Sequence, residues 1–123
     1  MNPVQGSPDK GMDLLLRLID ASELRAKVLS ANIANQNTPG YQRRDVNFES
    51  LLQEAMRKGP SAAQSIQPEV SLDTESPSRP DGNNVTLELE LNALRENRML
   101  YETYASILAG HFNLMRAAIT EGR

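Results

Sequence analysis

The sequence predicts an all-α, or mainly α, fold in which two long terminal helices pack as a hairpin or coiled coil. Apolar residues recur at spacings of three and four near both ends of the chain, and a Pro-Gly turn follows the first such segment. A Pro- and Ser-rich stretch separates the two helical segments. With 123 residues, the chain forms one domain at most.

The first apolar stripe predicts an amphipathic helix. Its members are Leu15, Ile19, Ala26, Leu29 and Ile33, with Ser22 in the one gap and with Leu14, Leu18, Ala21 and Val28 widening the stripe. Residues 1–11 are interpreted as a loose N-terminus. Ser7 precedes Pro8, and this pair is typical of a helix start, so we expect the helix to begin near Ser7 or Asp9 and to run to about Asn35.

A turn follows this helix. Thr38-Pro39-Gly40-Tyr41 predicts a type II turn, because proline presets φ at its second position and glycine accepts positive φ at its third. Asn32 and Asn35 lie three residues apart, on one face of the last helical turns. Two interpretations stay open: the asparagines satisfy the free carbonyls at the helix end, or they hold this junction against another helix and fix its register.

The middle of the chain divides into two parts. Residues 49–58 have helical composition and stop at Gly59-Pro60, so the region 12–58 is expected to contain the long helix, the turn and a short helix. Residues 59–84 contain four prolines, five serines and two glycines. This composition predicts a flexible or extended segment.

Residues 85–123 predict the second long helix, capped by Thr86 or Asn84, with Glu88 and Glu90 in a solvated first turn. A strand competes for the first few residues, where Val85 begins an alternation of apolar side chains. The helical stripe is broken only at Arg98 and comprises Leu87, Leu91, Leu94, Tyr101, Ala105, Leu108, Phe112, Met115 and Ile119.

Composition excludes several function classes. The formal net charge of -3 and the pI near 5.1 argue against a nucleic-acid-binding protein, and we expect Arg43-Arg44 to be a solvated or interface pair. No apolar run is long enough for a signal peptide or for direct membrane insertion. The chain has no cysteine, a single histidine, His111, and no phosphate-binding loop, so we expect no enzyme activity, no cofactor and no metal. Few aromatic residues make a thin core, which suggests protein partners.

The junction residues carry a family resemblance. Ser30-Ala31-Asn32-Ile33-Ala34-Asn35 followed by Thr38-Pro39-Gly40-Tyr41 resembles the N-terminal signature of the bacterial flagellar axial proteins of the rod and hook group. The segments 43–48 and 81–85 and the short length resemble the members that form the proximal rod. The second of these segments adds Gly82, Asn83 and Val85 to the residues expected to act in structure and assembly.

The resemblance implies a structural subunit of the proximal rod of the flagellar basal body that self-assembles helically and transmits torque. Its expected partners are other rod subunits and the ring and export-gate proteins of the basal body. It implies a place in the periplasmic part of the basal body, reached by type III export without a cleaved signal peptide. Phe48 and Leu52 resemble an export-gate motif, or they pack a short helix onto the hairpin. The alternative function is a stand-alone helical adaptor or export chaperone of a type III secretion system.

Overall fold

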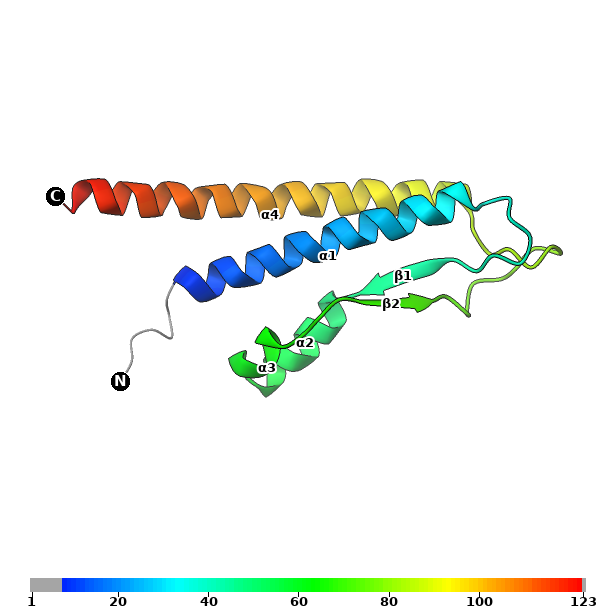
Figure 1. Ribbon diagram of the computed structural model, residues 1–123, viewed down its shortest axis with the longest axis horizontal. Helices are drawn as coiled ribbons and strands as arrows, with labels where there is room; N and C mark the ends of the chain where they lie inside the picture. Colours follow the sequence, from blue (N-terminus) through cyan, green and yellow to red (C-terminus); the bar gives the residue numbers. More distant parts are fainter. Residues whose placement is uncertain (1–7, 123) are drawn as a thin grey trace.

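The computed structural model describes residues 8–122 and consists there of long helices joined by shorter elements. In chain order these are α1 (Pro8–Ala34), β1 (Arg44–Asn47), α2 (Glu49–Lys58), α3 (Pro60–Gln64), β2 (Glu69–Leu72) and α4 (Leu87–Glu121). α1 and α4 lie side by side and run in opposite directions, and the short elements lie on the other side of α1 (Figure 1). The predicted fold, mainly helical with packed terminal helices, is confirmed.

α1 is buried from two sides because it lies between two layers. Leu15, Ser22 and Leu29, spaced by seven residues, are all buried. The backbone carbonyl of Ser22 accepts a hydrogen bond of 2.8 Å from the side chain of Asn97 in α4. The helix spans 27 residues, or about 40 Å, as the apolar stripe predicted. The expected capping residue Ser7 lies outside the described residues.

The side of α4 that faces α1 differs from the predicted stripe. The buried positions of α4 are Glu90 and Asn97, seven residues apart. Where the predicted stripe is broken at Arg98, the residue that faces α1 is its neighbour Asn97. Five residues of the predicted stripe are exposed: Leu91, Tyr101, Phe112, Met115 and Ile119. The helix therefore presents polar side chains to α1 and keeps part of its apolar surface open.

A short arm, residues 48–66, packs against the opposite side of α1. Its anchor is Phe48, which is fully buried and forms a core with Ala21 of α1 and Leu52 of α2. Partly buried hydrophobic residues surround this core: Leu14, Leu18, Ala63 and Ile66. The two sides of the α1 stripe thus serve different partners.

The segments before and after the arm are extended and pair with each other. β1 and β2 form an antiparallel pair in which Val46 is opposite Val70. α2 ends at Lys58, as predicted, and Gly59 follows with a φ of 131°. Within residues 59–84, β2 is extended as the composition suggested, whereas the five-residue helix α3 was not predicted.

Phe48→Ala is expected to lower the free energy of unfolding by about 3 kcal/mol, because it removes the largest buried side chain of the arm core. Urea titration followed by circular dichroism measures the change. Met56→Ala is the control, since Met56 is 56% exposed on α2. Equal stability of the two variants would contradict the arm core described above.

Candidate functional site: the helix junction

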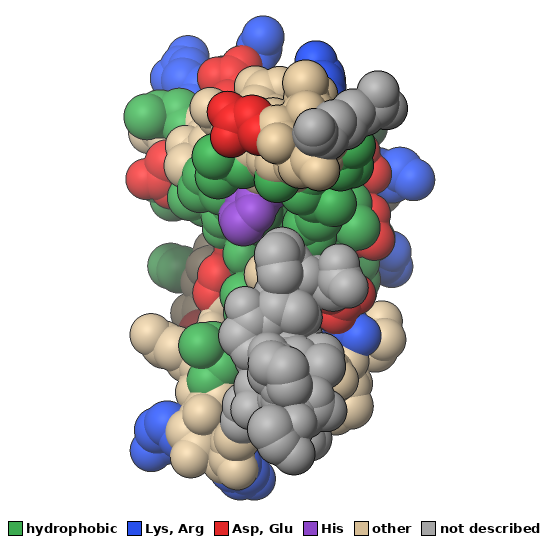
Figure 2. Space-filling view, turned by 90° about the vertical axis from the view of Figure 1, so that its left-hand side faces the viewer, with side chains coloured by type: hydrophobic (Ala, Val, Ile, Leu, Met, Phe, Trp, Pro, Cys, Tyr) green, Lys and Arg blue, Asp and Glu red, His purple; other side chains and the backbone are tan. Residues whose placement is uncertain are grey.

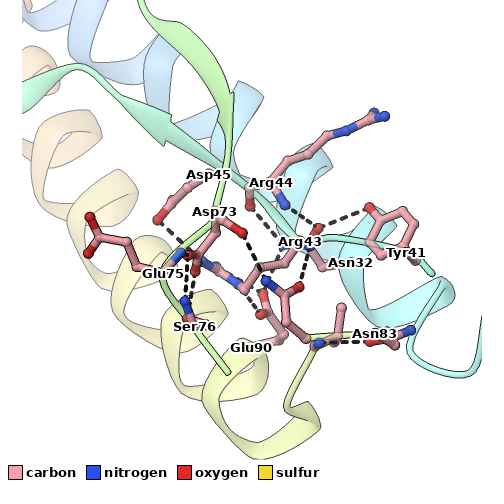
Figure 3. Close-up of polar contacts among 12 residues, drawn as sticks. Asn32, Tyr41, Arg43, Arg44, Asp45, Asp73, Glu75, Ser76, Asn83 and Glu90 are labelled. Atoms are coloured by element: carbon pink, nitrogen blue, oxygen red, sulfur yellow. Dashed lines mark hydrogen bonds and ion pairs between the residues drawn. The ribbon is translucent and has the colours of Figure 1, made fainter. Parts of the chain in front are cut away.

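The end of α1 and the start of α4 meet at a junction formed by residues 32–44, 73–85 and 90. Of the sequence-predicted residues, the structure brings these together: Asn32, Asn35, Thr38, Pro39, Gly40, Tyr41, Gly82, Asn83 and Val85. Phe48 and Leu52 lie apart from them, in the arm core. Figure 3 shows the polar contacts of the junction.

Two tight turns contact each other in the junction. The Tyr41 amide donates to the Thr38 carbonyl at 3.2 Å, and Gly40 has a φ of 75°, the geometry of the predicted turn. The Gly40 amide donates to the Asp81 carbonyl at 2.8 Å. Gly82 has a φ of 86°, and a Cβ there would lie 3.2 Å from the Gly40 Cα. Both glycines are therefore required by conformation, and Gly82 also by space.

Asn83 ties both turns to the end of α1. Its side chain is fully buried, and its amide donates to the carbonyls of Asn35 at 2.9 Å and Thr38 at 2.8 Å. Its Oδ1 accepts from the Val85 amide at 2.7 Å. One side chain thus gives a further donor to two carbonyls after the end of α1 and also fixes the chain entering α4.

Asn32 joins α1, β1 and α4. Its Nδ2 donates to the Arg44 carbonyl at 2.9 Å and to Glu90 Oε1 at 3.0 Å. Its Oδ1 accepts from the Arg44 amide and from the Tyr41 hydroxyl, both at 3.0 Å. Because an asparagine side chain offers two donors and two acceptor positions, every hydrogen-bonding position of this buried amide is occupied.

Asn35 has a local role by contrast. Its Nδ2 donates to the Ala31 carbonyl at 2.8 Å, and its Oδ1 accepts from the Thr38 hydroxyl at 3.1 Å. The two open interpretations of the asparagine pair therefore apply to different residues. Asn35 satisfies a carbonyl of its own helix, and Asn32 contacts the other long helix.

A buried ion pair lies beside Asn32, and sequence reasoning missed it. Arg43 Nε donates to Glu90 Oε2 at 2.5 Å, and Arg43 Nη2 donates to Glu90 Oε1 at 3.3 Å. Glu90 is 1% exposed, so its expected place in a solvated first turn was wrong. Arg43 also binds Asp73 at 3.0 Å and is not a solvated residue. The sequence signal for this ion pair was weak: it was the place of the Glu90 carboxylate on the side of α4 that faces α1.

Burial and hydrogen bonding shift several pKa values in and beside the junction. Burial alone would lower the pKa of Arg43, but its hydrogen bonds to Glu90 and Asp73 outweigh burial and raise it. The pKa of Asp73 is held well below its usual range by hydrogen bonds from the Ser76 side chain, from the Ser76 and Glu75 amides and from Arg43. These carboxylates and the guanidinium therefore form a charged network fixed by many donors.

A second polar contact lies one to two helical turns away. Arg25 donates to the Glu49 carboxylate from Nη1 and Nη2, and its Nη1 also donates to Asn97 Oδ1 at 3.3 Å. Burial would raise the pKa of Glu49, but the hydrogen bond from Arg25 lowers it below the ordinary value. Burial and the charge of Glu49 raise the pKa of Tyr104. This contact connects α1, α4 and the start of α2.

The start of α4 differs from the expected cap. Thr86 is in the capping position, but its side chain makes no capping hydrogen bond. Asn84 contacts the residue before β1 and the loop after β2: its Oδ1 accepts from the Arg43 amide at 2.7 Å, and its Nδ2 donates to the Asp73 carbonyl at 2.9 Å. The polar residues before α4 thus bind the junction in place of the helix end.

The chemistry of the junction is that of a structural lock. Its buried amides and its guanidinium are engaged within the chain. In residues 8–122 no cluster of three metal-binding side chains occurs. Over the same residues, every helix is too short or too polar to cross a bilayer. The arrangement suits a role in fixing how the two long helices pack.

Comparison with known proteins places this junction in a family. Residues 21–42 match the model of the family described as "Flagella basal body rod protein". The chain is 35% identical to the flagellar basal body rod protein FlgB of Yersinia ruckeri, over 80% of this chain and 85% of that protein. It is 34% identical to FlgB of Escherichia coli K12, over 80% of this chain and 84% of that protein. It is 30% identical to FlgB of Borrelia hermsii, over 90% of this chain and 96% of that protein.

Glu90→Gln is expected to lower the free energy of unfolding by about 3 kcal/mol, because it leaves the buried guanidinium of Arg43 without its main partner. Urea titration at neutral pH measures the loss. The matched control is Glu88→Gln, an exposed carboxylate in the same helical turn. A loss below 0.5 kcal/mol, the range of an ordinary surface substitution, would contradict the role given to the pair.

The stability of the chain is expected to fall in acid, and Asp73 contributes to this. Its pKa is depressed in the folded state, so its contribution is complete above pH 5 and is lost as the pH falls. Between pH 6 and pH 3, the free energy of unfolding should fall by about 1 kcal/mol less in Asp73→Asn than in the wild-type chain. Urea titrations at both values measure it, with Glu75→Gln as the control. If the stability of the wild-type chain and of Asp73→Asn fell by the same amount over this pH range, the depressed pKa of Asp73 would be ruled out.

Proposed function

The chain belongs to the FlgB family of flagellar basal body rod proteins, and we propose that it builds the proximal part of the rod by helical self-assembly. The observation that carries this proposal is the similarity to FlgB proteins over most of both chains. A subunit of this kind has a mechanical role: it transmits torque through packed helices. Rigid attachment of the helices to each other suits that role.

The junction supports a mechanical function because it gives the helices one relative position. Asn32 lies in α1, Glu90 in α4 and Arg43 directly before β1, and the contacts among them require one register of the helices. A sliding helix would leave buried charged and polar groups unpaired, which costs several kcal/mol. The junction therefore resists displacement of α4 along α1 under load.

We propose the following partners and location for the chain. Its partners are other rod subunits and the ring and export-gate proteins of the basal body. It lies in the rod where this crosses the periplasmic space, and it reaches this place by type III export without loss of a signal peptide. Phe48 and Leu52 are buried in the folded chain, so an export gate could contact them only while the arm is unfolded.

A stand-alone adaptor or export chaperone was the alternative function. Such a protein would also use a helical hairpin to bind partner helices. The similarity to rod proteins over 80–90% of the chain favours the rod subunit. Fractionation separates the two, because a rod subunit co-purifies with basal bodies and an adaptor does not.

Deletion of the gene is expected to abolish swimming and to stop rod assembly at its first step, and the wild-type gene should restore both. Gly40→Val should fail to restore swimming, because valine strains a turn with a φ of 75° and misdirects the chain after α1. Val70→Ala, at an exposed site, is the control. Electron microscopy of purified basal bodies shows the rod. Normal rods in the deletion strain would refute the proposed function.

A further inference from the structure

The chain has more surface than a compact protein of its size. It exposes 8342 Å², whereas a globular protein of 13.6 kDa exposes about 6,600 Å². The difference is larger than the ~800 Å² that one partner contributes to a standard protein interface.

Much of this open surface lies on α4, along two edges that flank its contact with α1. Spacings of three, four, seven and eleven residues keep side chains on one edge of a helix. The first edge, called the acidic edge, comprises the exposed residues Leu89, Glu96, Leu100, Ile107, Leu114 and Glu121. The second, called the basic edge, comprises the exposed residues Leu91, Arg98, Tyr101, Phe112, Arg116 and Ile119. Hydrophobic side chains reach the surface at the open end of the helix pair (Figure 2).

Hollows in the surface adjoin both edges and carry different charges. Beside the acidic edge, α4, α1, β1 and the start of α2 line a hollow that includes Glu96, Asp45 and Glu49. Its one guanidinium, Arg25, is already bound to Glu49. Beside the basic edge, α4 and α1 line a hollow with Arg95, Arg98 and one carboxylate, Glu23. Each edge therefore combines exposed apolar side chains with charge, and the two charges are opposite.

Opposite charges on two different edges fit each other across copies. Two acidic edges would repel, and so would two basic edges, so a symmetric contact between like edges is disfavoured. The acidic edge of one copy meets the basic edge of the next with matched charge and with apolar side chains on both. Because the two surfaces differ, a pair of copies still has one free edge of each kind, and the contact continues beyond a dimer.

We infer that the partner of each α4 edge is the opposite edge of a second copy of this chain. This inference rests on the proposed function, since it identifies the lateral neighbour within the rod. Arg98 is free to change partners: it is 78% exposed, and its contact with Glu102 at 3.3 Å is an exposed pair within one helix turn. An exposed pair of this kind contributes little to stability, so it does not hold Arg98 in place.

Charge reversal on α4 tests the inference. Sedimentation velocity of the purified full-length chain at low salt should show species larger than a dimer. Arg98→Glu and Glu96→Arg should each weaken self-association about tenfold, because each places like charges across the contact. The double variant E96R/R98E should restore it, since both edges exchange charge. An equimolar mixture of the two single variants should associate more tightly than either alone.

The arm offers a matched control. Arg57 pairs with Glu54 within α2 and is 76% exposed, almost as Arg98 is in α4. Arg57→Glu and Glu54→Arg should leave self-association unchanged, and circular dichroism checks that all variants keep their helices.

Three results would overturn the inference: a wild-type chain that stays monomeric up to about 1 mM, a closed dimer as the largest species, or a double variant as weak as the single ones. The proposed function is tested separately by the deletion strain. If the double variant does not recover while the wild-type gene restores rods, the inference fails and the rod function stands.

Discussion

The contact between Arg43 and Glu90 is the interaction on which the rest of the structure depends. It joins the segment between the turn and β1 to the first turn of α4, and Asn32 binds the same carboxylate from α1. Taking two charges out of water costs several kcal/mol per ion, so such a pair adds little net stability over apolar packing. What it adds is selectivity, because any arrangement that separates the partners retains the cost and loses the attraction.

The polar positions along α4 extend this selectivity to the whole helix pair. Glu90 and Asn97 are seven residues apart and contact α1 at Asn32 and Ser22. A shift of α4 by one heptad would keep the same side of the helix against α1, but it would separate Glu90 from Asn32 and Arg43. Polar residues at core positions fix register in this way in coiled coils. The turn after α1 and the buried Asn83 then lock one end of the pair, where both helices enter loops.

The sequence predicted those parts of the fold that depend on neighbouring residues. The two long helices, the turn with Gly40 and the end of α2 at Gly59 follow local patterns, and the structure has them at nearly the predicted bounds. The pairing of Arg43 with Glu90 could not be predicted, because 47 residues separate the partners and a single chain gives no covariation. Glu90 was read as a solvated first-turn residue, since a carboxylate at a helix start is usually exposed and favoured by the dipole.

The seam of α4 also differs from the prediction because polar side chains occupy buried positions. An apolar stripe along α4 predicts Tyr101 and Phe112 in the seam and a break at Arg98. The buried line is polar in part, so these apolar residues belong to an edge that the chain itself leaves open. A helix pair held in register by polar contacts needs less apolar surface for its own packing. The remainder is available to neighbours, which is the condition for a subunit that completes its core only within an assembly.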